Sequence, residues 1–271
     1  MELTLLIQVV IMGIVEGLTE FLPISSTGHL ILAGSLLNFT GEKVKVFEIV
    51  IQAGAMLAVC WEYRVKIARV ILDFRSDIAA RRFVVNLMVA FLPAVVLGLA
   101  FGKAIKAHLF KPIPVALAFI IGGFVIIVIE KRHRRVMYSR VDAVDDMSVV
   151  DALKVGLAQC FALIPGTSRS LATILGGRVA GLSHAASTEF SFLVGLLTLS
   201  AASVYKMWSL GPALTQVYPA GPAGVGLLVA AVTAFVSVKW LVGYVSRHGL
   251  GVFAWYRIAL GGAILAFLAL S

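Results

Sequence analysis

Long apolar stretches without a charged residue are the feature that most restricts the fold of this chain. Four of them cover residues 83–102, 113–129, 190–205 and 217–238. A helix needs about 20 apolar residues to cross the hydrocarbon core of a bilayer, with a range of about 17 to 25. Only 14% of the residues are charged and 60% are hydrophobic, whereas about a quarter of the residues in soluble domains are charged. The sequence therefore predicts an all-α polytopic membrane protein.

The basic residues are concentrated between the apolar stretches. The chain has 23 Lys and Arg against 14 Asp and Glu, a formal net charge of +9. Two basic clusters, at 64–82 and 131–140, flank a pair of apolar stretches, so both are expected on one side of the membrane. The positive-inside rule makes that side the cytoplasm. The excess charge predicts an orientation, and no nucleic-acid partner is expected. Both clusters are interpreted as loops.

Two motifs recur along the chain at a nearly constant interval. FLPISST recurs as LIPGTSR, and FEIVIQAG recurs as TEFSFLVG. This similarity predicts internal repeats, approximately 1–110 and 150–271, within one membrane domain over 1–271, because no long polar linker separates them. Transporter folds are often built from such repeats, with their sites where the repeats meet.

The apolar pieces beside these motifs are too short to cross a bilayer singly. They cover 3–15 and 30–37 around the first motif, and 152–164 and 171–182 around the second. Each pair is interrupted by a proline together with Ser, Thr and Gly. The pattern predicts two re-entrant helical hairpins. Irregular backbone at membrane depth is tolerated only in protein or beside a wet cavity, so both tips are expected to line one cavity.

The first motif begins with two acidic residues on one helical face. Glu16 and Glu20 are four positions apart, a spacing that places side chains one above the other. An acid at mid-bilayer costs about 2.5 kcal/mol or more on insertion scales. The pair therefore indicates a hydrated pocket, a bound cation or a shared proton. Solvation near the lipid headgroups is the alternative.

Hydroxyl residues and a histidine follow a proline that ends the first half-helix. Ser25, Ser26 or Thr27 can cap the next helix, and the free N–H groups of a helix start bind phosphate well. Gly28 permits close approach of a ligand to the backbone. His29 is three residues from Ser26, within reach for proton transfer or nucleophilic attack. Alternatively, the hydroxyl residues only cap the helix, and His29 only makes a hydrogen bond at the membrane interface.

The second motif, PGTSRSLATILGG, repeats this arrangement and adds Arg169. A guanidinium matches phosphate oxygens in a two-pronged fork, which a lysine cannot do. Alternatively, Arg169 pairs with a structural glutamate or extends to the lipid headgroups. Two anion-attracting helix starts together predict a pyrophosphate-shaped site. Arg257 is interpreted as a side chain that reaches the membrane surface, and Glu48 and Glu189 as parts of the scaffold.

EGLTEFLPISSTGHLIL and PGTSRSLATILGG resemble the two signature motifs of the bacterial undecaprenyl pyrophosphate phosphatase family, also called bacitracin-resistance proteins. The similarity extends to FEIVIQAGAMLAV, LPAVVLGL, ASTEFSFL and YRIALGG. The resemblance implies six spanning helices, two re-entrant hairpins and an inverted repeat. It also implies a bacterial inner-membrane protein that forms a homodimer, with a site that opens to the periplasm.

The activity that the resemblance implies is hydrolysis of undecaprenyl pyrophosphate to undecaprenyl phosphate and inorganic phosphate. This reaction recycles the lipid carrier of cell-wall synthesis and confers bacitracin resistance. The implied catalytic residues are Glu16, Glu20, Ser26, His29 and Arg169. Those expected to bind the substrate are Ser25, Thr27, Gly28, Gly166, Thr167, Ser168, Ser170 and Thr173. A divalent cation, Mg²⁺ or Ca²⁺, is expected on the two glutamates.

Within this site Ser26 is the favoured nucleophile, with His29 as its base or as the acid for the leaving phosphate. Direct attack by His29 is the alternative. The chain departs from the family at Leu171, where a glycine is usual, and near Leu197, where a proline is missing. Two other functions stay open: a polyprenyl-phosphate transporter or flippase with the same site, and a lipid-binding homologue without catalysis.

Overall fold

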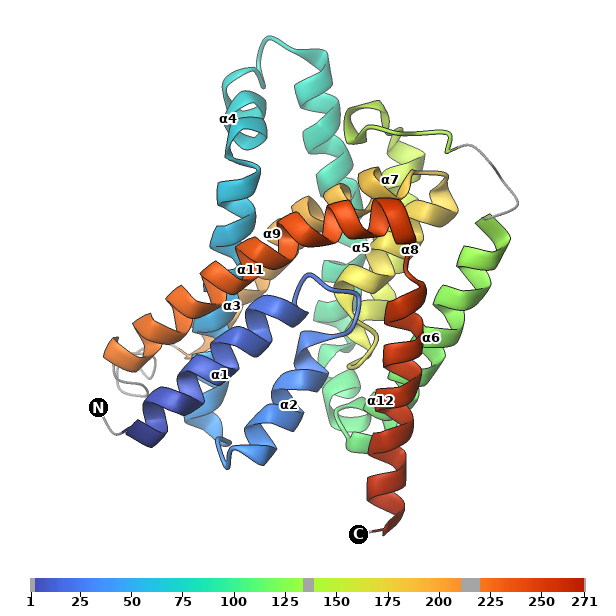
Figure 1. Cartoon of the computed structure of the whole chain (residues 1–271). Helices are drawn as coiled ribbons and strands as arrows, with labels where there is room; N and C mark the ends of the chain where they lie inside the picture. Colours follow the sequence, from blue (N-terminus) through green and yellow to red (C-terminus); the bar gives the residue numbers. More distant parts are fainter. Residues whose placement is uncertain (1–2, 134–138, 211–219, 271) are drawn as a thin grey trace.

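The computed structural model describes residues 3–133, 139–210 and 220–270 (Figure 1). Helices account for the regular structure of this part of the chain, apart from one bridge between Val141 and Leu182. The α-helices are α1 Leu3–Thr19, α2 Ser26–Leu36, α3 Glu42–Glu62, α4 Arg64–Leu72, α5 Ile78–Leu109, α6 Pro112–His133, α7 Val149–Gln159, α8 Arg169–Ala180, α9 His184–Leu210, α11 Ala220–His248 and α12 Gly251–Leu270.

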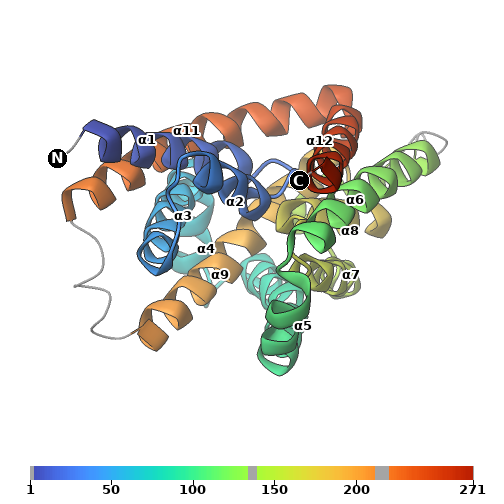
Figure 2. The ribbon, with the colours of Figure 1, turned by 90° about the horizontal axis from the view of Figure 1, so that it is seen from below.

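Six of these helices, α3, α5, α6, α9, α11 and α12, are long and apolar enough to cross a membrane. This confirms the predicted all-α, multi-pass class. Seen from below, α5 and α11 lie on opposite sides of the bundle (Figure 2). The helices α2, α7 and α8 have 11, 11 and 12 residues. At a rise of about 1.5 Å per residue they are too short for a core of about 30 Å.

The short helices form two hairpins that approach each other from opposite ends of the bundle. In Figure 1 the pair α1–α2 occupies the lower part of the molecule and the pair α7–α8 the upper part. Their tips, residues 20–25 and 160–168, meet near the middle. A hydrogen bond of 2.8 Å from the Ser170 hydroxyl to the Leu22 carbonyl joins one hairpin to the other. The predicted interruptions of the apolar segments are therefore the places where the chain turns back.

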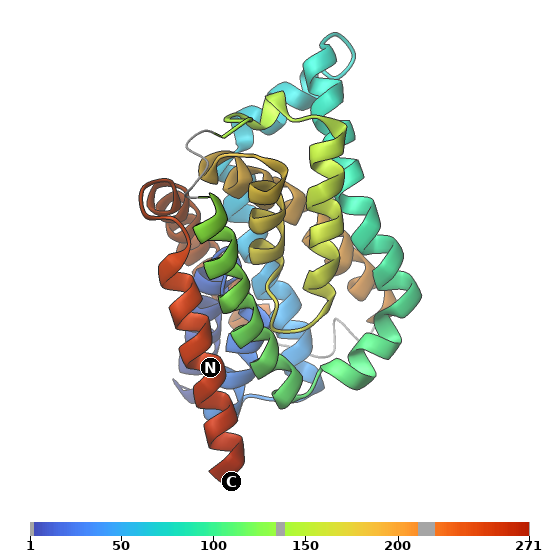
Figure 3. The ribbon, with the colours of Figure 1, turned by 90° about the vertical axis from the view of Figure 1, so that its right-hand side faces the viewer.

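Small residues allow neighbouring helices to pack closely, both between a hairpin and a long helix and between two long helices. A methyl group at Gly17 of α1 would lie 2.5 Å from the Ala230 carbonyl oxygen on α11. At Gly261 of α12 it would lie 2.7 Å from the Ala116 carbonyl oxygen on α6. Figure 3 shows α12 beside α6 and α7 beside α5. Close backbone approach at small residues is the usual basis of helix packing in membranes.

Polar contacts fix the start of α7 and therefore the second hairpin. Ser148 and Asp151 cap the helix reciprocally, and Arg140 pairs with Asp151. Burial disfavours the charged carboxylate, but the hydrogen bonds from Ser148 and the pairing with Arg140 outweigh it and hold the pKa of Asp151 below its ordinary value. The carboxylate of Glu189, which was interpreted as part of the scaffold, lies 3.0 Å from Lys66 Nζ.

One predicted loop is partly helical. Residues 64–82 were expected to be a basic loop, but α4 continues from α3 with only Tyr63 between them. The segment RVKIARVIL contains Arg, Lys, Ala and Leu, which are good helix formers. Its basic residues were interpreted as a sign of a loop, and the helix was therefore not predicted.

Candidate active site

Each hairpin tip reverses through a serine with strained backbone. Ser25 has a φ of 72° and Ser168 a φ of 76°, and each directly precedes the first residue of a helix, α2 or α8. A residue other than glycine in this region costs on the order of 1–3 kcal/mol and persists only where its surroundings enforce it. Strain at the same place in both motifs makes the two tips a candidate functional site.

The two helix starts differ in how they are capped. The Ser168 hydroxyl accepts a hydrogen bond of 3.2 Å from the Leu171 N–H and so caps α8. The Ser25 side chain makes no such bond at the start of α2. The first turn of α2 therefore lacks a side-chain cap and can offer its N–H groups to an anion.

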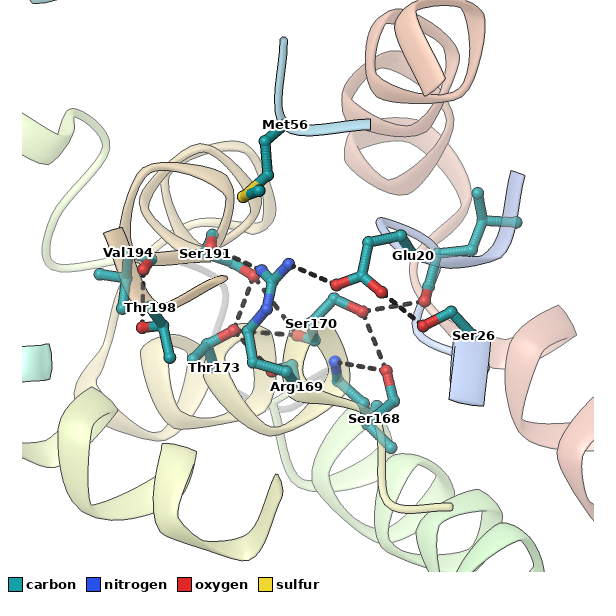
Figure 4. A network of polar contacts seen from close by, with 12 residues as sticks. Glu20, Ser26, Met56, Ser168, Arg169, Ser170, Thr173, Ser191, Val194 and Thr198 are labelled. Atoms are coloured by element: carbon teal, nitrogen blue, oxygen red, sulfur yellow. Dashed lines mark hydrogen bonds and ion pairs between the residues drawn. The ribbon is translucent and has the colours of Figure 1, made fainter. Parts of the chain in front are cut away.

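An ion pair connects the two hairpins beside their tips. Arg169 Nη2 lies 3.0 Å from Glu20 Oε1, and the two side chains are 10% and 5% exposed. The other oxygen of Glu20 accepts a short hydrogen bond from the Ser26 hydroxyl. Figure 4 shows the resulting chain of contacts from Arg169 through Glu20 to Ser26. Three predicted site residues from distant parts of the sequence thus touch each other.

Further hydrogen bonds hold Arg169 in place. Its Nη1 donates to the Ser191 carbonyl oxygen at 3.0 Å, and the hydroxyls of Thr173 and Ser191 lie 2.6 Å apart. The hydroxyls of Ser168 and Ser170 are 2.9 Å apart and complete the network (Figure 4). Ser191 was not among the predicted site residues. Only its place in the motif ASTEFSFL could have indicated it.

Of the two glutamates at the first tip, Glu16 is the one without a hydrogen-bond partner among the described residues. It is 1% exposed, and neither of its oxygens has a hydrogen-bond partner among the described residues. Glu20 lies one turn further on, but both of its oxygens are engaged. No group of three or more metal-binding side chains is found in the described part of the chain. Mg²⁺ usually binds one or two carboxylates together with phosphate oxygens and water, and Glu16 fits that mode.

Both ring nitrogens of His29 are bonded to partners other than the Ser26 hydroxyl. Its Nδ1 lies 2.8 Å from the Ser25 carbonyl oxygen, which can only accept, so Nδ1 carries the proton. Its Nε2 lies 2.5 Å from the Tyr256 hydroxyl, which therefore donates to it, and the two rings are stacked with centroids 5.6 Å apart. The Ser26 proton is directed to Glu20 instead. Tyr256 was missed by the sequence analysis.

The interpretation of Arg257 as a side chain that reaches the membrane surface is wrong. The side chain is fully buried and donates to three carbonyl oxygens: Pro23 at 3.3 Å, Ala118 at 3.0 Å and Gly166 at 2.9 Å. The irregular tips leave carbonyl groups without helical partners, and a guanidinium can satisfy several of them at once.

The remaining predicted ligands are less central. Thr27 is exposed, and its hydroxyl makes none of the hydrogen bonds found among the described residues. Gly28 packs against an aromatic ring, because a methyl group there would lie 2.6 Å from Phe119 Cζ. Gly166 adopts a φ of 92°, which favours glycine, and it supplies a carbonyl to Arg257. Thr167 lies at the second tip beside an apolar groove.

That groove runs between α6 on one side and α7 and α8 on the other. Its volume is about 660 Å³, and its lining is apolar, with Leu117, Ile121, Ala158 and Leu175 among the contributing side chains. Leu171 also lines it and is otherwise buried in the core. Leu171, the position at which the second motif departs from the resemblance, therefore faces this groove.

The sequence profile described as "Bacitracin resistance protein BacA" matches residues 9–263. The chain belongs to this family. The protein named undecaprenyl-diphosphatase 2 from Rhodospirillum rubrum is 58% identical over 267 residues, which cover 98% of this chain and 96% of the relative. The undecaprenyl-diphosphatase from Herminiimonas arsenicoxydans is 57% identical over 266 residues, with the same coverage of both chains. The family to which the sequence motifs pointed is thereby confirmed.

Proposed function

We propose that this protein is an undecaprenyl-diphosphatase, an integral membrane enzyme that converts undecaprenyl pyrophosphate to undecaprenyl phosphate and inorganic phosphate. The names of its relatives support the substrate and the reaction. The observation that carries the proposal is the Arg169–Glu20–Ser26 contact. It places a cation, a base and a hydroxyl together at an uncapped helix start, as transfer of a phosphoryl group requires.

In the first step the Ser26 hydroxyl oxygen attacks the terminal phosphorus while its proton passes to Glu20, with which it is already hydrogen-bonded. The new O–P bond forms as the anhydride P–O bond breaks, and undecaprenyl phosphate leaves. Water then cleaves the phosphoserine and releases inorganic phosphate. Arg169 and the N–H groups at the start of α2 stabilise the charge that develops on the phosphoryl oxygens.

Direct attack by His29 is less favoured, because its Nε2 lone pair already accepts the Tyr256 hydroxyl and its Nδ1 carries a proton. Glu16 would hold a divalent cation through its unpaired oxygens. When bound, Mg²⁺ or Ca²⁺ would neutralise part of the diphosphate charge.

In the membrane, we propose that the hairpins α1–α2 and α7–α8 are re-entrant and enter from opposite faces as an inverted repeat. The apolar groove beside Thr167 and Leu171 would receive part of the isoprenoid tail. With the basic clusters at 64–82 and 131–140 in the cytoplasm, the first hairpin enters from the periplasmic face of the inner membrane. A homodimer stays a prediction of the family resemblance.

The test is phosphate release from undecaprenyl pyrophosphate by the purified protein in detergent. Arg169→Ala and Glu20→Ala are expected to lower kcat about 10²- to 10³-fold, the usual effect of removing one transition-state contact. Arg247→Ala, an exposed arginine at the end of α11, is the control. Rates near wild type in both site variants would overturn the assignment. Trapping the phospho-enzyme and mapping the label to Ser26 or His29 decides the nucleophile.

The transporter alternative rests on the two hairpin tips that meet in the middle of the bundle, because broken helices at a repeat interface are typical of transporters. Hydrolysis in detergent, where no gradient exists, supports the enzyme. Movement of labelled polyprenyl phosphate across liposomes without hydrolysis supports the transporter. Tight binding without either activity would indicate a non-catalytic lipid-binding protein.

A further inference from the structure

Arg257 is a buried cation with no carboxylate partner. Its side chain is 0% exposed, and the ion pairs found among the described residues do not include it. A buried charge is normally paired or coordinated, because removing it from water is costly. Three backbone carbonyls and the face of Phe119, with its ring centroid 5.1 Å from Cζ, take the place of a carboxylate.

The carbonyls that Arg257 binds belong to both hairpin tips. Nη1 donates to Pro23 in the first tip, and Nη2 donates to Gly166 in the second. A third bond, from Nη2 to Ala118, fixes the fork to α6. Only a planar guanidinium offers donors in this fixed geometry, and a lysine ammonium presents a single nitrogen.

The surrounding helices leave space for this guanidinium. Gly122 of α6 faces it: a methyl group there would lie 2.9 Å from Cζ and 3.0 Å from Nε, and closer still to Nη2. The preceding residue, Tyr256, reaches His29 from the same helix. The start of α12 therefore contacts both tips and the candidate histidine.

We propose that Arg257 is a positioning residue that clamps the two hairpin tips together, so that Arg169 and Glu20 meet beside Ser26. The clamp acts through backbone carbonyls and does not touch the substrate. Its charge, not neutralised by a carboxylate, also makes the site more favourable for a diphosphate. This inference rests on the proposed diphosphatase function for its effect on the rate, but the clamp itself can be tested without it.

The decisive variant is Arg257→Lys, which keeps the positive charge and loses the two Nη donors that bond both tips. We expect kcat to fall about 10- to 100-fold, because small misplacements of reacting groups have effects of this size, while KM changes by less than about twofold since the charge is kept. Arg257→Gln, which also loses the charge, is expected to lower kcat and to raise KM. Arg247→Lys, at an exposed position on α11, is the matched control.

Amide hydrogen exchange followed by mass spectrometry tests the clamp independently of catalysis. Arg257→Lys is expected to speed exchange in peptides from both tips, 20–28 and 164–170, and to leave α5 and α9 unchanged. Gly122→Ala, which displaces the guanidinium without removing it, provides a second variant if Arg257→Lys does not fold. Gly262→Ala, where a methyl group meets nothing within 4 Å, is its control.

Wild-type exchange at both tips, together with wild-type kcat in a folded Arg257→Lys protein, would overturn the proposal. Faster exchange at one tip only would also overturn it, because a clamp must release both. If the wild-type protein releases no phosphate, the proposed function fails, but the exchange experiment still decides whether Arg257 holds the tips together.

Discussion

A single methyl group at position 195 should displace Arg169 without altering its charge. Gly195 lies on α9 against the guanidinium, and a methyl group there would be 2.7 Å from Nη2 and closer to Nη1 and Cζ. Carbon atoms pack at about 3.5–4.0 Å, so the guanidinium must move by roughly an ångström or more. That shift breaks the 3.0 Å contact with Glu20.

The size of the effect follows from the contacts that Arg169 would lose. A hydrogen bond to a charged group is worth about 1.5–3 kcal/mol, and about 1.36 kcal/mol corresponds to a tenfold change in rate. Loss of one such contact in the transition state predicts a fall in kcat of about 10- to 150-fold. Overpacking should also lower the free energy of unfolding by about 1–3 kcal/mol.

The assay is phosphate release from undecaprenyl pyrophosphate by Gly195→Ala, with thermal unfolding in the same detergent to confirm that the protein is folded. Gly243→Ala on α11 is the matched control, because a methyl group there meets nothing within 4 Å. Its kcat should equal that of wild type. A folded Gly195→Ala protein with wild-type kcat would refute the claim that the position of the guanidinium matters for catalysis.

Three further variants test separate parts of the site. Ser25→Gly should raise the free energy of unfolding by about 1 kcal/mol, because glycine relieves the backbone strain. Ser168→Ala keeps the strain and loses the cap of α8, so it should lower the free energy of unfolding by about 1 kcal/mol. Thermal unfolding in which Ser25→Gly is less stable than wild type and Ser168→Ala is more stable would contradict both. Tyr256→Phe keeps the ring stack and removes one hydrogen bond to His29, so kcat should fall only about 2- to 13-fold, and a loss as large as that of His29→Ala would show a direct catalytic role for the tyrosine. Glu16→Gln should raise the Mg²⁺ concentration needed for half-maximal activity by about tenfold, and an unchanged requirement would remove Glu16 from the cation site.

The fold class and the convergence of the two hairpin tips could be predicted because they depend on local patterns. Uninterrupted apolar stretches identify helices that can span a membrane, and proline with hydroxyl residues identifies the hairpin tips. The repeat then implied that the two tips share one site. The meeting of Glu20, Ser26 and Arg169 agrees with that reasoning.

The residues that were missed act across helices that are distant in the sequence. Ser191 contributes a backbone carbonyl, and any residue type could provide that group. Tyr256 and Arg257 lie in an apolar helix near its start, where an amphipathic side chain ordinarily extends to the membrane surface. Whether such a residue faces lipid or a neighbouring helix depends on the packing of α12 against α6, and no periodicity in the segment reveals it.

The hydrogen-bond partner of the Ser26 hydroxyl could not be predicted from the sequence either. The short spacing between Ser26 and His29 suggested a nucleophile–base pair, because residues three apart on a helix are neighbours. In the structure the imidazole bonds back to the Ser25 carbonyl and across to Tyr256, so its free lone pair is already used. Glu20 is the first residue of the tip, and the reversal of the chain brings its carboxylate to the Ser26 hydroxyl at the start of α2.

The two repeats, although built on similar motifs, contribute different chemistry. The first tip leaves the start of α2 without a side-chain cap and supplies the hydroxyl and the carboxylates. The second caps its own helix with Ser168 and supplies the cation. If both starts were open and both carried arginine, the empty site would hold unpaired positive charge at membrane depth, which is costly. In the proposed mechanism, Glu20 neutralises the charge of Arg169 until a diphosphate competes for the guanidinium, and the released carboxylate then takes the proton of Ser26.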